Sequence, residues 1–275
     1  MITLFLIFFF ILGAIIGSFL NVVILRLNTG RGLNGRSGCL SCNKQLHWYE
    51  LVPIISFFAL RRRCSGCESK ISWQYPLVEI STALIFCGVF LKQLNIFYYA
   101  PSLAIVELIF YLVIWSTLVV VFVYDLKHTI IPNFLAYSFA GLAFILNLIQ
   151  IPFDFWFETK FLLDILSGFI FFIPFFCLWY FSNGRLIGLG DGKLALGIGF
   201  LLGFVSGLSA LVLAFWIGAV FSIFLMLVKR LNISSHNITI KSEIPFAPFL
   251  IIGTLILFFV PFDLLSIAWL FNLNV

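Results

Sequence analysis

Two aspartates at breaks between apolar runs have the residue type and the setting for acid–base catalysis. Asp125 ends one apolar run in YDLKH (124–128), and Asp191 lies in GLGDGK (188–193), just before another. Two carboxyl groups at one level of a helical bundle can share a proton, so that one activates water while the other protonates a carbonyl oxygen. Gly188 and Gly190 would let an extended substrate backbone approach Asp191 closely. Each aspartate alone also fits an ordinary helix-end residue, and the residues by themselves leave both interpretations open.

Four cysteines form a second group with a chemical pattern. Cys39-x-x-Cys42 is followed, after 21 intervening residues, by Cys64-x-x-Cys67. Two such pairs are typical of a structural zinc site with four thiolate ligands. Two disulfides are the alternative, which a reducing compartment disfavours. We expect one structural zinc ion per chain, because a short polar segment has little core of its own and a metal would supply its folding energy.

The composition of the chain decides what must position these groups. Of its 275 residues, 63% are hydrophobic and only 10% are charged, whereas soluble domains are about 45–50% apolar and about 25% charged. This excludes a soluble enzyme, a disordered chain and a nucleic-acid-binding domain. The net charge of +5 does not indicate nucleic acid either, because 8 of the 16 Lys and Arg residues fall within residues 26–70.

The apolar runs predict an all-α polytopic membrane protein with about eight transmembrane helices. Residues 2–25 carry no charge and form the first expected span, and a polar segment over 26–75 holds the four cysteines. Further apolar runs follow at 77–91, 102–124, 133–151, 161–181, 194–205, 207–228 and 246–270. The run 194–205 is too short to cross about 30 Å of hydrocarbon alone. We therefore predict a first span (1–25), a small zinc domain (26–75) and a transmembrane catalytic domain (76–275).

The positive charges predict the orientation of the chain. If the N-terminus lies outside, the inner loops carry fourteen Lys and Arg residues and the outer loops only Lys92 and Lys160. Positive residues favour the cytoplasmic side. We therefore expect the cysteines and both aspartates at the cytoplasmic face, and anionic lipid headgroups as partners of the basic segment.

Four other acids have plainer interpretations. Glu50 and Glu79 flank the cysteine segment, where they could serve a reaction or pair with Arg61–Arg63. Glu107 and Asp164 fall near the expected outer ends of spans, where an interfacial position is the simplest expectation.

Six segments, taken in order, resemble the type IV prepilin peptidases. These are GSFLNVVILR (17–26), the two CxxC pairs, WYELVPIISF (48–57), the segment from Asp125 to Pro132, GLGDGKL (188–194) and IPFAPFL (244–250). Single motifs of this kind are weak, but six in one order over nearly the whole chain are specific. One departure is Ala247, where that family commonly has glycine.

The resemblance implies a multi-pass enzyme of the bacterial inner membrane with two activities. It implies a GxGD-type aspartic protease that removes the basic leader of type IV prepilins or pseudopilins, with Asp125 and Asp191 as the catalytic pair. It further implies N-methylation of the new N-terminus from S-adenosylmethionine. Gly188 and Gly190 match the glycines of the second motif, and Cys39, Cys42, Cys64 and Cys67 match the zinc ligands of a domain associated with methylation.

Two other functions stay open at this point. The chain could be a peptidase alone, with a zinc domain that only shapes the cytoplasmic face. It could also be an ion-coupled transporter that uses the two aspartates as a relay, although that function gives no role to the cysteines.

Overall fold

The computed structural model describes residues 1–30, 32, 35–150, 159–230 and 245–266. Within these ranges the chain is helical, with no strand and only two isolated antiparallel bridges. Among the described residues, six helices are long and apolar enough to cross a membrane, which confirms the predicted all-α membrane class. The predicted number of about eight spans stays a prediction. The chain divides into two compact units, residues 1–120 and 121–275.

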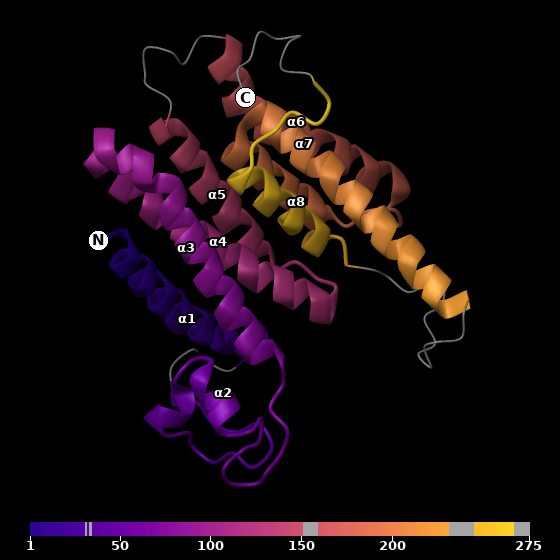
Figure 1. Ribbon diagram of the computed structural model, residues 1–275. Helices are drawn as coiled ribbons and strands as arrows, with labels where there is room; N and C mark the ends of the chain where they lie inside the picture. The colour runs from indigo at the N-terminus through magenta and orange to yellow at the C-terminus, as the bar shows by residue number, and fades with distance from the viewer. Residues whose placement is uncertain (31, 33–34, 151–158, 231–244, 267–275) are drawn as a thin grey trace. The chain divides into compact units, whose positions relative to one another are not determined.

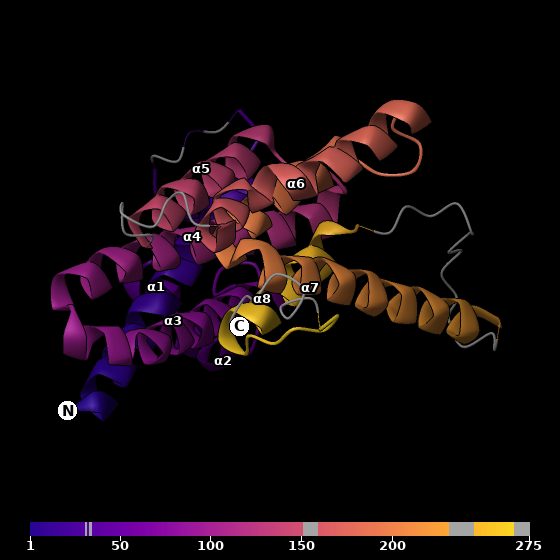
Figure 2. The same cartoon turned by 90° about the horizontal axis from the view of Figure 1, so that it is seen from above.

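The first unit is built on the helices α1 (Ile2–Arg26) and α3 (Gln74–Tyr99), which lie side by side in Figures 1 and 2. Two glycines of α1 permit this close packing. A Cβ at Gly13 would lie 2.6 Å from the Cα of Ala83, and one at Gly17 would lie 2.8 Å from the Cα of Glu79. Small residues let helix backbones approach where lipid gives no hydrophobic drive for association.

The polar segment between α1 and α3 has little regular structure. It contains the short 3-10 helix η1 (Trp48–Leu51) and one helix, α2 (Ile55–Ala59). Phe57 of α2 is buried, and the centre of its ring lies 5.0 Å from that of Trp73, which precedes α3. The segment thus stands on the ends of α1 and α3 (Figure 1).

The second unit is a bundle centred on one long helix. After α4 (Pro101–His128), which runs from the first unit into the second, come α5 (Asn133–Gln150), α6 (Thr159–Ser182), α7 (Leu189–Arg230) and α8 (Ala247–Phe259). Helix α7 packs against α5, α6 and α8. The predicted run 246–270 thus yields a shorter helix, which ends just before Pro261; a proline disfavours helical geometry in the residue that precedes it.

Helix α7 is broken at Gly203, whose φ of 74° and ψ of −172° belong to a region open essentially to glycine alone. A Cβ at Gly207 would lie 3.5 Å from the Cα of Gly199, whereas these residues are about 12 Å apart along a straight helix. The chain therefore turns back sharply. The predicted runs 194–205 and 207–228 become two arms of α7, and the first, residues 189–202, is about 21 Å long, short of the bilayer core.

Side chains from two neighbouring helices satisfy the backbone groups that this break exposes. The Oδ1 atom of Asp164 on α6 accepts a hydrogen bond of 2.8 Å from the backbone N–H of Phe204, where the second arm begins. The amide of Asn147 on α5 donates to the carbonyl of Phe200 at 2.9 Å, where the first arm ends. Broken helices persist in membranes only when such groups are paired again. Asp164 thus caps the second arm of α7, and its expected interfacial position stays a prediction.

The first unit also contains a buried acid with a partner on another helix. Glu107 on α4 is only 3% exposed, and its Oε2 accepts a hydrogen bond from the amide of Gln93 on α3 at 2.9 Å. Hydropathy could not show this contact, because it does not indicate which face of α4 is covered by protein.

Candidate active site and metal site

Asp125 lies in the last turns of α4 and is only 4% exposed. Its carboxyl group accepts a hydrogen bond from the backbone N–H of Ala247. This N–H is free to donate because the first N–H groups of a helix have no partner within it, and α8 begins at Ala247. The positive end of the α8 dipole therefore faces a carboxylate. The second oxygen, Oδ2, is buried and has no protein partner, so it is available to a substrate or water.

Asp191 lies in the first turn of α7 and is half-buried. Its carboxyl group accepts the backbone N–H of Gly188 and is close enough to Asp125 for the two charges to repel. The structure thus brings together two acids that are 66 positions apart in the chain. Repulsion between two carboxylates disfavours the state in which both are ionised.

The two glycines next to Asp191 have different surroundings. A Cβ at Gly190 would lie 3.0 Å from the side chain of Ile131, so Gly190 lets the α4–α5 connection pack on the start of α7. A Cβ at Gly188 would be 3.5 Å from the carboxylate of Asp191, an ordinary contact. Gly190 therefore has a packing role that the sequence did not indicate, and substrate contact by either glycine stays a prediction.

A buried lysine adds a second tie between the same segments. Lys193 is 8% exposed, and its Nζ donates to Oδ1 of Asn133 at 2.6 Å and lies 4.8 Å from the ring centre of Tyr137. Asn133 and Tyr137 belong to the first turns of α5. The ammonium group thus links α5, which follows Asp125, to the helix that carries Asp191.

The four predicted cysteine ligands meet in the first unit. The sulfur atoms of Cys39, Cys42, Cys64 and Cys67 all lie within 4.8 Å of one another, and those of Cys39 and Cys67 are 3.8 Å apart. Four sulfurs around a tetrahedral zinc ion at about 2.3 Å would be separated by about 3.8 Å. All four are free thiols rather than disulfides. The donor set therefore fits a zinc ion.

Each CxxC pair lies in a turn of the same design. An antiparallel bridge closes each turn, Gly38 with Gln45 and Arg63 with Lys70. The residue after each second cysteine has a positive φ, 55° at Asn43 and 57° at Glu68. A backbone N–H faces the first sulfur of each turn at 3.4 Å. Such N–H groups favour a thiolate, and those of Cys42 and Ser41 help to lower the pKa of Cys39 to about 6.

The two acids near this cluster do not pair with Arg61–Arg63. Glu50 is buried and accepts hydrogen bonds from the Ser65 hydroxyl and the His47 N–H, which lower its pKa, and its Oε1 lies 3.4 Å from Nζ of Lys44. Glu79 is 5% exposed and accepts the N–H of Ile54 at 2.7 Å. Both acids therefore hold loops of the polar segment in place.

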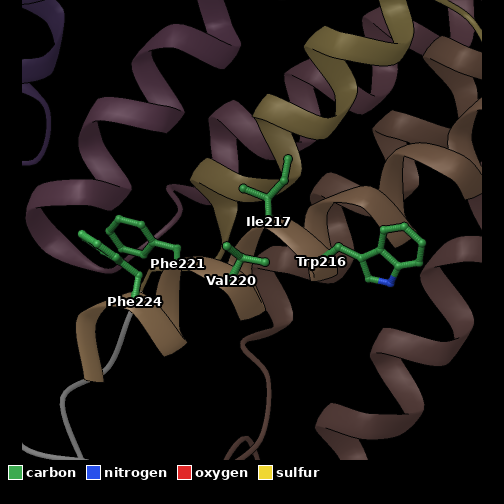
Figure 3. Close-up of a pocket in the computed structure, with 5 residues that line it drawn as sticks. All are labelled: Trp216, Ile217, Val220, Phe221 and Phe224. Carbon is green, nitrogen blue, oxygen red and sulfur yellow. The ribbon is translucent and has the colours of Figure 1, made fainter. Parts of the chain in front are cut away.

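An apolar hollow on α7 is not part of either site. It has a volume of about 440 Å³ and is lined by aliphatic and aromatic side chains, namely Trp216, Ile217, Val220, Phe221 and Phe224 (Figure 3). An apolar surface on a membrane helix is what lipid chains contact.

Sequence reasoning missed two groups that shape the aspartate site. The first is the N–H of Ala247. The only indication of it in the sequence was that Ala247 lies in IPFAPFL, the last of the six segments that resemble the family. Lys193 is the other, since its charge was counted only toward orientation. Its position immediately after the Asp191 motif and before an apolar run was the available signal.

Comparison with protein-family models adds independent information. Residues 11–93 match the model described as bacterial peptidase A24 N-terminal domain, and residues 111–223 match the type IV leader peptidase family. No solved structure matches the chain significantly.

Among curated proteins, the chain is similar to several that are named prepilin leader peptidase/N-methyltransferase. It is 36% identical to that of Myxococcus xanthus over 82% of this chain and 64% of the relative. It is 29% identical to that of Bacillus subtilis over 90% of this chain and 91% of the relative. It is 31% identical to that of Vibrio cholerae over 72% of this chain and 78% of the relative. The chain thus spans just under two thirds of the Myxococcus relative and most of the other two.

Proposed function

The chain belongs to the type IV leader peptidase family, and on that premise we propose that it cleaves the leader from prepilins and methylates the new N-terminus. The observation that carries the proposal is the pairing of Asp125 with Asp191 beside the N-terminus of α8. The names of the relatives supply prepilins as the substrate class and the methylation step. Pseudopilins are added as substrates from the motif resemblance.

The geometry supports an aspartic protease mechanism without a covalent intermediate. In the singly protonated pair, the ionised carboxylate takes a proton from water, which attacks the scissile carbonyl carbon, while the protonated carboxyl group donates to the carbonyl oxygen. The unpaired Oδ2 of Asp125 is the atom best placed to meet this water or the substrate. The Ala247 N–H orients the same carboxyl group through its other side.

Gly188 and Gly190 are proposed to line the path of the substrate backbone. The N–H of Gly188 already bonds to Asp191, so an extended chain at this turn would lie next to the catalytic carboxyl group. The packing of Ile131 on Gly190 keeps the turn in place from the other side.

The zinc domain is proposed to hold one zinc ion and to support methyl transfer. Zinc in a four-thiolate site has no open coordination position, so it would shape the domain rather than take part in the reaction. S-adenosylmethionine would serve as methyl donor. The domain lies in the unit that does not contain the aspartates, which favours a division of cleavage and methylation between the predicted domains 26–75 and 76–275.

We propose a bacterial inner-membrane location with the zinc domain and both aspartates on the cytoplasmic side. The bias of fourteen positive residues against two supports it. The break at Gly203 supports it as well, because a chain that turns back there returns through the second arm of α7 toward the side from which α7 began.

Incubation of the purified protein with a prepilin in detergent or lipid, with and without S-adenosylmethionine, tests the proposal. Mass spectrometry should show loss of the leader in both reactions and one added methyl group only when the donor is present. Cleavage without methylation would indicate a peptidase alone. Absence of cleavage would contradict the proposed function.

A further inference from the structure

A strained turn within the zinc domain is hydrogen-bonded to a membrane helix. Ile54 has φ 63° and ψ −55°, and the N–H of Ile55 bonds to the carbonyl of Pro53 at 2.5 Å. These values define a γ-turn of the rare, strained kind. A positive φ is especially unfavourable for a β-branched residue. Backbone strain of this type persists only where surrounding groups enforce it.

One buried side chain enforces this turn. The Ile54 N–H donates to Oε2 of Glu79 at 2.7 Å, although the two residues are 25 positions apart. The hydroxyl of Ser18 on α1 also bonds to the Glu79 carboxyl group. Gly17 lets α1 approach Glu79 closely enough for this contact. The carboxyl group therefore joins α1, α3 and the loop before α2.

The position of the turn determines what it can influence. It lies between the two CxxC pairs and directly precedes α2, whose buried Phe57 packs against Trp73. If Ile54 relaxed to a negative φ, the direction of the chain entering α2 would change. The sulfur cluster would keep its own turns, because those are closed by their own bridges. The turn thus sets how the domain sits on α1 and α3 without forming the metal site.

We propose that Glu79 is a positioning residue for methyl transfer and acts through the Ile54 turn. The inference rests on the proposed N-methyltransferase activity. A methyl group passes only between atoms held in near-attack geometry, so small shifts of a domain that supports the reaction cost rate. Cleavage depends on Asp125 and Asp191, which belong to the other unit. Loss of the turn should therefore lower methylation and spare cleavage.

Three variants separate positioning from direct chemistry. Glu79→Gln removes the charge but keeps an oxygen that can accept the Ile54 N–H. Glu79→Ala removes the acceptor. In the double variant Glu79→Ala with Ile54→Gly, glycine adopts a positive φ without strain, so the turn no longer needs the acceptor. Each variant is assayed for cleavage and methylation in one reaction with a prepilin and S-adenosylmethionine, and for zinc content.

The expected pattern is specific to positioning. Glu79→Ala should lower methylation at least about tenfold, with zinc content and cleavage retained, since a hydrogen bond to a charged acceptor and the strain it balances are both lost. Glu79→Gln should keep methylation within about threefold of the wild-type rate, and the double variant should restore it to the same range. Amide exchange at Ile54 should be faster in Glu79→Ala than in wild type.

Other outcomes overturn the inference and show why. If Glu79→Gln loses methylation and Ile54→Gly rescues nothing, the carboxylate acts directly on a reactant. If Glu79→Ala methylates normally, or if cleavage falls by the same factor, the turn does not position methyl transfer. A wild-type protein that cleaves but never methylates contradicts the proposed methyltransferase instead, and amide exchange at Ile54 still tests whether Glu79 holds the turn.

Discussion

The zinc-binding segment and the aspartate site are built in opposite ways. The four sulfurs come from two short turns within residues 39–67, each closed by its own bridge and each with a positive φ after the second cysteine. The aspartate site takes one group from the end of α4, one from the start of α7 and one from the start of α8. The first site can form locally once metal binds, whereas the second exists only when a helical bundle has assembled.

The largest expected effect concerns the aspartate site alone. Asp125→Asn or Asp191→Asn should each reduce prepilin cleavage by about 10²–10⁴-fold, because general acid–base groups contribute that much. Zinc content should stay at one ion per chain. The measurement is initial rate by mass spectrometry, with zinc by atomic absorption. Retention of more than about a tenth of wild-type cleavage by either variant would contradict the proposed pair.

The second experiment removes the zinc site and leaves the aspartate site in place. Cys64→Ser with Cys67→Ser should reduce bound zinc from about one ion per chain to nearly none. Methylation should then fall at least about tenfold more than cleavage, since the metal supplies folding energy to its own segment. Both products are measured in one reaction. Equal losses would show that the two regions depend on each other. Cys87→Ser is the control, because this cysteine of α3 lies outside the sulfur cluster.

A third experiment tests whether the bundle depends on the break in α7. Gly203→Ala forces a side chain into a glycine-only conformation and places a Cβ 2.5 Å from Oδ1 of Asp164. We expect a loss of unfolding free energy of about 1–3 kcal/mol with an unchanged zinc content. Denaturation in detergent measures it. Gly141→Ala in α5 is the matched control, because a Cβ there meets nothing within 4 Å; it should be neutral or slightly stabilising.

The smallest effect is expected at the start of α8. Ala247→Gly keeps the N–H that bonds to Asp125 and removes only a buried methyl group. Cleavage should stay within about threefold of wild type, since glycine costs a helix only about 0.5–1 kcal/mol. Steady-state kinetics provide the test. A loss of more than about tenfold would mean that the methyl group itself shapes the site.

The sequence predicted the features whose geometry depends on residues close together in the chain. The two CxxC pairs predicted the sulfur cluster, since cysteines three positions apart can present both sulfurs to one metal ion from a single turn. The long apolar runs predicted the membrane helices, because backbone hydrogen bonds in lipid leave a chain few other choices. The two aspartates were identified as candidates from their motif and their positions at breaks between runs.

Contacts between distant residues were decided only by the tertiary structure. The apolar runs 194–205 and 207–228 placed a break close to Gly203, but they could not show that Asp164 and Asn147 of two other helices pair with the backbone on either side of it. Nor could hydropathy show that Glu107 pairs with Gln93 on another helix. The N–H of Ala247 reaches Asp125 because a helix leaves its first donors unpaired and the bundle brings that end to the carboxyl group. The sequence by itself determined which residues carry the chemistry, whereas packing among helices determined which of them meet, since that depends on faces and directions that a linear pattern does not contain.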